Sequence, residues 1–139
     1  MPKRLALVSL LVPNYDQALA YFAGRLGFEL RKDSDLGDGK LWVRIGLPGA
    51  ATEFLLARAL GEGQSAAIGA QGGGRVWLFL ETEDFDRDFA AFTAEGVTFE
   101  EPPRVEPYGR VAVFRDPWGN RWDLIQYADP ATRRGPSAR

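Results

Sequence analysis

The chain has 139 residues, of which 45% are hydrophobic and 26% are charged, a balance typical of one globular domain. Its formal net charge of −2 argues against a nucleic-acid partner, because phosphate binding needs a basic surface. The chain contains no His and no Cys, which excludes the commonest general base, the commonest transition-metal ligand and every thiolate. Any catalysis must therefore use carboxylates, Tyr, Lys or Arg, and any metal must be held by oxygen ligands.

The first half of the chain predicts a strand, a helix and three further strands. Leu5–Val12 is almost continuously apolar, and we expect a buried first strand there and not a signal peptide. Asn14 is placed to cap a helix that stops at Gly27. The strands expected to follow are Phe28–Lys32, Leu41–Leu47 and Thr52–Arg58. No apolar run approaches the roughly 18 residues that span a bilayer, so we expect a cytoplasmic protein with no membrane partner.

The same order of elements is predicted again after a segment rich in Gly, Ala, Gln and Ser, residues 59–74, which is typical of a linker. A helix from Phe85 to Gly96 lies among four expected strands: Arg75–Glu81, Val97–Glu100, Val111–Arg115 and Arg121–Tyr127. At an offset of about 70 residues, the pattern of the first helix, Tyr15, Asp16, Leu19, Ala20 and Phe22, matches that of the second, Phe85, Asp86, Phe89, Ala90 and Phe92. We therefore predict an internal duplication in one α+β domain, residues 5–127, with βαβββ modules 5–58 and 75–127 and a disordered tail, 128–139.

Two motifs resemble a known superfamily. The segment Tyr108–Gln126, YGRVAVFRDPWGNRWDLIQ, resembles the closing hairpin of the glyoxalase/bleomycin-resistance/extradiol-dioxygenase (vicinal oxygen chelate) superfamily. Val12–Phe22 and Leu26-Gly27-Phe28 resemble its opening strand and helix. The resemblance implies that the two modules form a curled mixed sheet around a cavity and that the protein is a homodimer. Within the hairpin, Asp116 has the chemistry of a turn residue, so we predict a structural role for it.

The resemblance also implies where a metal would bind. Metalloenzymes of the superfamily take ligands from the first and fourth strands of each half, and these positions fall on Leu7, Glu53, Arg75 and Asp123. Leu7 has no lone pair to donate, and Arg75 carries a permanent positive charge. We therefore expect no metal and no other cofactor. Arg75 is expected to bridge the two carboxylates in place of an ion.

Strand alternation adds neighbours to these positions. Trp77 and Phe79 share a face with Arg75, and Arg121 shares one with Asp123. By the resemblance, Tyr108 lies near the mouth of the cavity. The predicted ligand-binding residues are Glu53, Arg75, Trp77, Phe79, Tyr108, Arg121 and Asp123, and no catalytic residue is assigned. A structural role, as core for the aromatic residues and as an ion-pair network for the charged ones, stays open as an alternative.

These observations favour a protein that binds an unidentified small molecule without a metal, as bleomycin-resistance-type members do. One alternative is a superfamily enzyme, a lyase, isomerase or dioxygenase, with an atypical metal site. Another is a metal-independent enzyme in which Arg75 polarises a carbonyl and a carboxylate acts as base. The sequence does not name the ligand.

Overall fold

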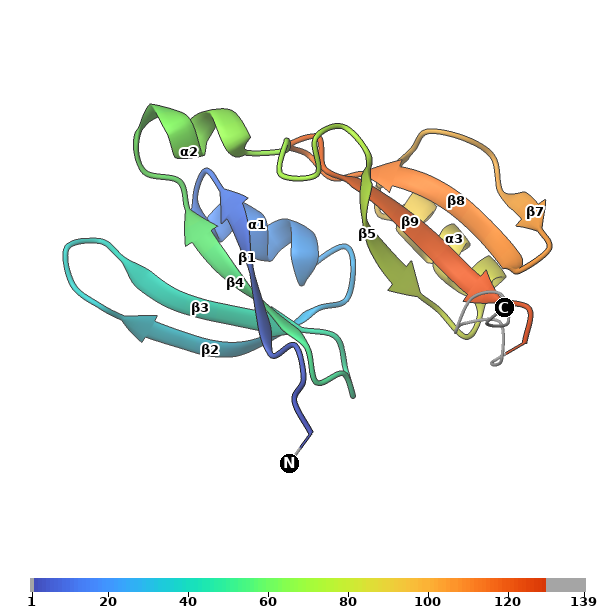
Figure 1. The fold of residues 1–139 in the computed structure, drawn as a ribbon, viewed down its shortest axis with the longest axis horizontal. Coiled ribbons are helices and arrows are strands. Elements are labelled where there is room, and N and C mark those ends of the chain that lie inside the picture. Colours follow the sequence, from blue (N-terminus) through green and yellow to red (C-terminus); the bar gives the residue numbers. More distant parts are fainter. Residues whose placement is uncertain (1, 130–139) are drawn as a thin grey trace. The chain divides into compact units, whose positions relative to one another are not determined.

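The computed structural model describes residues 2–129 and shows a mixed α+β fold with a four-stranded and a five-stranded sheet (Figure 1). The predicted fold class is therefore confirmed. The chain divides into two compact units, Met1–Ile68 and Gly69–Arg139, which are called module 1 and module 2 below. Within residues 2–129, no helix is long and apolar enough to cross a membrane. Residues 130–139 of the predicted tail lie outside the described part of the chain.

Module 1 contains β1 (Leu7–Val12), α1 (Tyr15–Phe22), β2 (Glu29–Asp35), β3 (Leu41–Gly46), β4 (Glu53–Arg58) and α2 (Gly61–Ala67). The sheet order is β1-β4-β3-β2, with β1 parallel to β4 and the other pairs antiparallel. Helix α2 corrects the expectation that residues 59–74 form a plain linker. The Leu60 N–H donates to the Gln64 side-chain oxygen at 2.9 Å, and this contact supports the first turn of α2.

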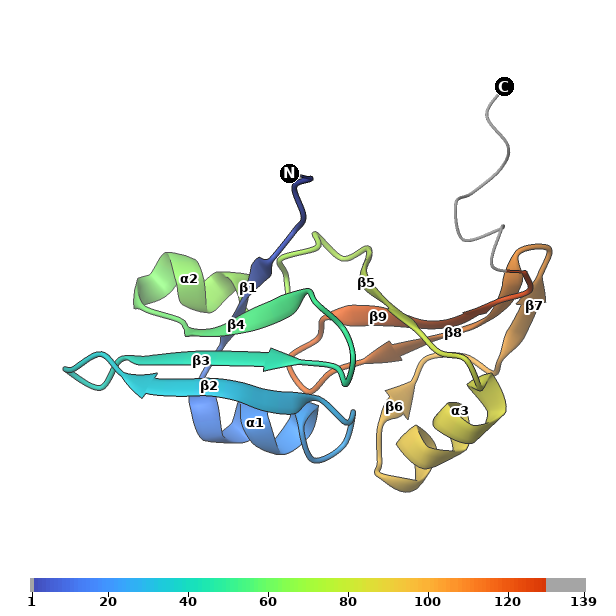
Figure 2. The same cartoon turned by 90° about the horizontal axis from the view of Figure 1, so that it is seen from below.

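The core of module 1 lies between α1 and one face of its sheet (Figure 2). Asn14 caps the helix as predicted, since its side-chain oxygen accepts the Gln17 N–H at 2.8 Å. Phe22 packs edge-on against Phe28, with 5.7 Å between ring centroids. The buried sheet residues are Leu10, Val12, Val43, Ile45 and Leu56. Because side chains alternate along a strand, the opposite face carries the residues between them. This open face is formed by Leu7, Ser9 and Leu11 of β1, Trp42, Arg44 and Gly46 of β3, and Glu53, Leu55 and Ala57 of β4.

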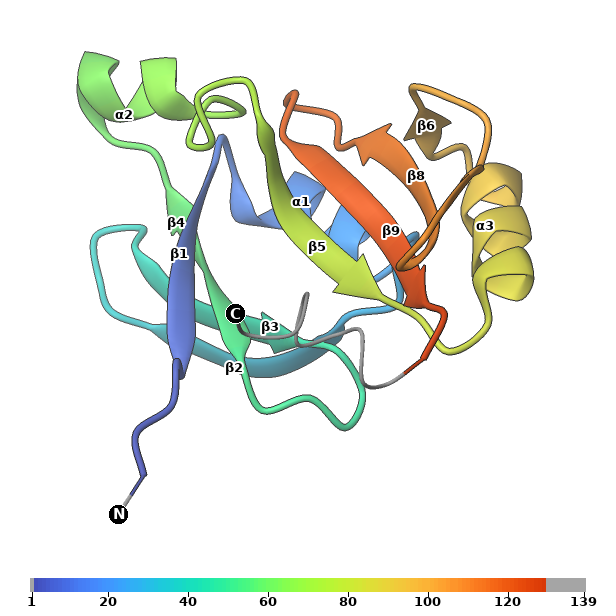
Figure 3. The same cartoon turned by 45° about the vertical axis from the view of Figure 1, so that its right-hand side comes forward.

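Module 2 contains β5 (Val76–Glu81), α3 (Phe85–Ala94), β6 (Thr98–Phe99), β7 (Arg104–Glu106), β8 (Gly109–Arg115) and β9 (Arg121–Tyr127). Its sheet order is β5-β9-β8-β6, with β7 paired to β8 and β5 parallel to β9. Figure 3 shows β5, β9 and β8 side by side. Strand β7 was not predicted, because three residues are too few to show a hydrophobic period.

Aromatic residues fill the core of module 2 between α3 and the sheet. Phe114 stacks on Trp122 with 5.7 Å between centroids, and Phe92 contacts Phe114 at 5.6 Å. Asp116 is buried in the β8–β9 turn, where its carboxylate accepts four hydrogen bonds, from the Trp118 and Asn120 N–H groups, the Asn120 amide and the Trp122 indole. The predicted structural role of Asp116 is confirmed.

Candidate functional site

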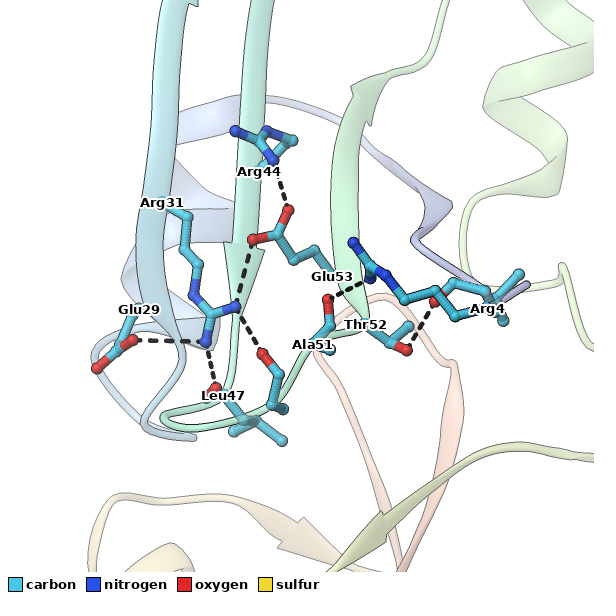
Figure 4. A network of polar contacts seen from close by, with 10 residues as sticks. Arg4, Glu29, Arg31, Arg44, Leu47, Ala51, Thr52 and Glu53 are labelled. Carbon is cyan, nitrogen blue, oxygen red and sulfur yellow. Dashed lines mark hydrogen bonds and ion pairs between the residues drawn. The ribbon is translucent and has the colours of Figure 1, made fainter. Parts of the chain in front are cut away.

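Glu53 forms the centre of an ion network on the open face of module 1 (Figure 4). In the strand register it lies beside Leu7 of β1 and Gly46 of β3. Arg44 Nη1 donates to Glu53 Oε1 at 2.7 Å, and Arg31 Nη1 donates to Oε2 at 3.2 Å. The Glu53 side chain is only 13% exposed. Each carboxylate oxygen is therefore paired with a guanidinium group from the same module.

Arg31 is anchored by more than its ion pair with Glu53. Its Nη1 donates to the Ala50 carbonyl at 2.8 Å, its Nη2 donates to the Leu47 carbonyl, and Glu29 lies 3.5 Å away. A Cβ added at Gly46 would lie 2.7 Å from Arg31 Cζ. The missing side chain at Gly46 thus gives the guanidinium room to lie against β3 and reach Glu53.

A cavity of about 280 Å³ opens beside this network, lined by Arg4, Ala6, Leu7, Trp42, Arg44, Ala51 and Glu53. Trp42 is 36% exposed, and with Leu7 it supplies apolar wall. Arg4 donates to the Ala51 carbonyl at 3.3 Å. The cavity therefore combines an aromatic wall with two guanidinium groups and one carboxylate. Apolar walls with a few orienting polar groups are typical of small-molecule sites.

Module 2 holds the other carboxylate that the resemblance assigned to a ligand position, Asp123 of β9. It is 7% exposed and lies opposite Phe79 of β5 and Val113 of β8. Its Oδ1 is buried and has no hydrogen-bond partner among the described residues. Burial raises the pKa of Asp123 to about 6; the Arg104 charge opposes this shift and the Glu101 charge adds to it. Asp123 thus differs from Glu53, because one of its carboxylate oxygens is buried without a hydrogen-bond donor.

Arg75 lies outside the strand in which it was predicted. It precedes β5, is exposed, and makes no ion pair with any residue between 2 and 129. The helix caps Asn14 and Asp84 are 70 positions apart, so Leu7 corresponds to Trp77 in module 2. Counting back from Leu80 therefore placed the third ligand position two residues too early. Arg31 and Arg44 neutralise Glu53, the role that the sequence led us to expect of Arg75.

Among the other predicted site residues, Arg121 is held in an ion pair. Its Nε and Nη2 donate to both Glu100 oxygens at 2.9 Å, and Arg115 Nε donates to Glu100 Oε2 at 2.6 Å. Hydrogen bonding from Arg121 lowers the pKa of Glu100, and burial opposes this shift. The Arg121 guanidinium is therefore used within module 2, in line with the structural alternative.

The predicted aromatic residues of module 2 have different surroundings. Phe79 is 62% exposed, so it is not a core residue. Trp77 is half-buried and lies where the β5–β9 register is irregular, between Val76 and Leu78, so alternation does not indicate its face. Tyr108 is 40% exposed and lies in the turn between β7 and β8. Phe79 and Asp123 are neighbours in the register, and they are the pair of predicted residues that module 2 brings together.

The residues present do not fit the metal site of the metalloenzymes. Module 1 offers Leu7, which has no donor atom, and Glu53, whose two oxygens are already paired with arginines. Module 2 offers a single carboxylate, Asp123, and the β5 residue opposite it in the register is Phe79, which has no donor atom. Across residues 2–129, nowhere do three acidic side chains gather into a group that could hold a metal ion. Divalent cations need several oxygen ligands, so this donor set disfavours them.

Sequence reasoning missed Arg31 and did not assign Arg44 to a face. Arg44 alternates with the buried Val43 and Ile45, and this signal was available. Arg31 lies at an irregularity in the β2–β3 register, between Leu30 and Lys32, where alternation no longer indicates a face. The long reach of an arginine across a glycine is also invisible to strand periodicity.

Comparisons with known proteins agree with this architecture. The family model of the Glyoxalase/Bleomycin resistance protein/Dioxygenase superfamily matches residues 4–124. An uncharacterized protein from Shewanella frigidimarina (strain NCIMB 400) is 41% identical over 131 residues, which cover 93% of this chain and 97% of that protein. The crystal structure of TnmS3, an antibiotic binding protein from Streptomyces sp. CB03234, is similar with a TM-score of 0.76 and 28% identity, covering 91% and 98% of the two chains. A glyoxalase/bleomycin resistance protein from the same strain has a TM-score of 0.71 and 30% identity, covering 88% of this chain and 100% of the other.

Proposed function

This chain belongs to the Glyoxalase/Bleomycin resistance protein/Dioxygenase superfamily, and from that premise we propose that it binds a small molecule without a metal ion. The observation that carries the proposal is the pairing of Glu53 with Arg31 and Arg44, beside Leu7. A cation at Glu53 would have to displace two guanidinium groups and would find no donor atom at Leu7. Arg44 lines the cavity beside Glu53 and is placed to donate to a ligand there.

The cavity beside Glu53 indicates the kind of ligand. Trp42 presents a large aromatic surface, and Leu7 adds aliphatic wall. Arg4 and Arg44 are permanent hydrogen-bond donors. A flat molecule with carbonyl or phenolic oxygens would stack on the indole and accept bonds from the guanidinium groups. The likeness to TnmS3, an antibiotic binding protein, supports binding as the function.

For module 2, taken by itself, we propose Phe79, Trp77, Tyr108 and Asp123 as ligand-contact residues. Phe79 is exposed beside Asp123, whose buried Oδ1 has no donor among the described residues. A ligand N–H or O–H group would satisfy that oxygen.

We also expect a homodimer in the cytoplasm with no nucleic-acid or membrane partner. Sedimentation velocity on the purified protein would test the oligomeric state.

A metal-independent enzyme is the second candidate, and Asp123 is the observation that favours it. With its pKa raised to about 6 by burial, this carboxyl group exchanges a proton close to neutral pH. Its unpartnered Oδ1 is oriented by no other side chain in the described part of the chain. In this case a bound substrate would be consumed, whereas a binding protein returns its ligand unchanged.

Thermal-shift and calorimetric screening tests the proposal. The panel contains Mn²⁺, Zn²⁺ and Ni²⁺ together with aromatic antibiotics, aromatic acids and thiols. We expect stabilisation by an aromatic compound, about 2.7 kcal/mol at 100 times its Kd, that persists in EDTA. Trp42→Ala and Arg44→Gln should remove the shift. Arg87→Gln, on the exposed surface of α3, is the matched control and should keep it.

Each result of the screen decides between the candidates. An ion retained at one equivalent per chain, with stabilisation lost in EDTA, would contradict the metal-free proposal. Chromatography of the bound compound after incubation separates the two candidates: an unchanged compound supports binding, and conversion that Asp123→Asn abolishes supports the enzyme.

A further inference from the structure

Strands β3 and β4 separate before either one ends. Their register runs from Val43 opposite Leu56 to Gly46 opposite Glu53, although β3 begins at Leu41 and β4 continues to Arg58. The Tyr15 hydroxyl occupies the gap, accepting from the Leu41 N–H at 3.1 Å and donating to the Leu41 carbonyl at 3.3 Å. A side chain from α1 thus satisfies the backbone groups that β4 leaves unpaired, and it keeps the strands apart.

A second cavity, of about 230 Å³, opens where the strands separate. Its lining includes Arg58 at the end of β4 and Gln64 of α2. Figure 1 shows β4 leading into α2. Leu41 and the exposed Leu60 supply apolar wall, and Trp42 forms one side. Every lining residue belongs to module 1. The cavity shares Trp42 with the one beside Glu53 and is otherwise distinct from it.

The polar groups of this second cavity are hydrogen-bond donors. Arg58 reaches across the gap from β4 toward the β2–β3 turn, where its Nη2 would lie 3.8 Å from a Cβ at Gly39. Its Nε is buried and has no partner among residues 2–129. Lys40 and Gln64 also line the cavity, and the Gln64 oxygen is already used by the Leu60 N–H, which leaves its NH₂ group to donate.

Among the described residues, no acidic side chain lines the cavity to balance these donors. Neither Arg58 nor Lys40 has a carboxylate within ion-pair distance in the described part of the chain. Arg58 and Lys40 thus lie beside Trp42 with no counterion, and this arrangement favours the binding of an anionic group.

We propose that this cavity binds the anionic head group, a carboxylate or a phosphate, of a compact molecule with a flat apolar body. Arg58 and Lys40 hold the head group through charge-assisted hydrogen bonds, and the body stacks on Trp42. The volume is below the roughly 300 Å³ at which drug-sized sites begin, so one or two rings are the upper size. This inference does not rest on the proposed function: the two cavities share Trp42, but Arg58 and Lys40 hold the anion, and neither Arg44 nor Glu53 takes part.

Isothermal titration calorimetry with four probes tests the inference: benzoate, 1-naphthoate, phenyl phosphate and the neutral 1-naphthylmethanol. We expect the anions to bind at least tenfold more tightly than the neutral compound, as for one charge-assisted contact. The ratio of phenyl phosphate to benzoate affinity identifies the preferred head group. Equal affinity for 1-naphthoate and 1-naphthylmethanol, or no binding of any anion, would overturn the proposal.

Variants locate the binding within module 1. Arg58→Gln should weaken 1-naphthoate binding at least tenfold and Lys40→Gln several-fold, while Lys3→Gln, an equal loss of charge outside the lining, should leave it unchanged. The side-chain amide resonances of Gln64 should shift on titration in a ¹⁵N NMR spectrum. Unfolding midpoints close to the wild-type value show that the variants are folded, and Arg58→Lys is the second variant if Arg58→Gln is unstable. Unchanged binding in Arg58→Gln, or binding that leaves the Gln64 resonances unmoved, would contradict the proposed anion site. This conclusion holds whether or not a ligand binds beside Glu53.

Discussion

Glu53 and Asp123 lie in the last strand of their modules, and each of these strands pairs in parallel with the first strand of its module, yet the surroundings of the two carboxylates are opposite. Glu53 is paired with Arg31 and Arg44, and both of its oxygens have a charged donor. Asp123 is more buried, has one oxygen without a partner and has a raised pKa. Relatives that bind a metal satisfy such carboxylates with an ion; here one is satisfied by guanidinium groups and the other is left close to protonation.

The two modules therefore differ in preorganisation: the carboxylate of module 1 already has its partners, and the carboxylate of module 2 does not. In module 1 the ion network fixes the direction of Arg44 before any ligand arrives, which reduces the entropy lost on binding. In module 2 the buried Oδ1 of Asp123 accepts no hydrogen bond from any described residue. Three substitutions test this contrast.

The largest effect is expected for Glu53→Ala. Removing the carboxylate leaves Arg44 without its ion-pair partner and leaves Arg31 with only the more exposed Glu29, both arginines being partly buried. We expect the free energy of unfolding at pH 7 to fall by about 3 kcal/mol, at the lower end for a broken buried pair because both arginines keep some contact with water. Urea denaturation measures the change. Glu62→Ala on the exposed surface of α2 is the control and should cost less than about 0.5 kcal/mol; similar losses for both variants would refute the network as a stabilising feature.

Asp123→Asn should have the opposite sign. The folded-state pKa, about 6, lies above the usual 3.8, so the folded protein holds this proton more tightly than the unfolded chain. Stability from this group is complete below about pH 4 and is lost as the pH rises through 6. At pH 8 the Asn variant, which cannot ionise, should be more stable than wild type by about 1–2 kcal/mol, and the gain should vanish toward pH 4.

Urea titrations of both proteins at several pH values measure that difference. Asp33→Asn, at an exposed position of β2, provides the comparison for a carboxylate with no such burial. A constant difference between Asp123→Asn and wild type across the range would show that burial does not raise the pKa of Asp123. Loss of ligand binding in Asp123→Asn at unchanged stability would place this carboxylate at the ligand.

The fold was predictable from the sequence because its strongest signals are local. The Asn14 cap and the Asp116 turn each depend on residues within a few positions, and each is where the pattern indicated. The expected helix stop at Gly27 was wrong: α1 ends at Phe22, and a turn separates it from Gly27, whose φ is +86°. Helix α2 and strand β7 were missed for physical reasons. Helix α2 buries none of its residues, so it has no apolar period, and β7 is held by its pairing with β8.

The candidate site was predictable in part. Glu53 and Asp123 were found by their place in strands, but their surroundings depend on contacts between residues far apart in the chain. Arg31 reaches Glu53 through a register irregularity, which strand alternation does not describe. Arg75 was assigned by matching Leu80 to Val12, although the helix caps Asn14 and Asp84 match Val12 to Thr82, two residues further on. Periodicity therefore identifies faces of regular strands and fails where a bulge moves a side chain.

The smallest effect, and the most specific, is expected for Gly46→Ala. A methyl group there would lie 2.7 Å from the Arg31 guanidinium, which must move away from Glu53. Alanine in a strand gains about 0.5–1 kcal/mol over glycine, and the displaced ion pair and carbonyl contacts cost more, so we expect a net loss of about 1 kcal/mol. In an Arg31→Ala background the obstacle is gone, and the same substitution should become stabilising. A double-mutant cycle measured by urea denaturation gives this coupling directly. An equal effect of Gly46→Ala in both backgrounds would show that the glycine is needed by the strand itself and does not make room for Arg31. The preorganised ion network of module 1 would then not depend on Gly46.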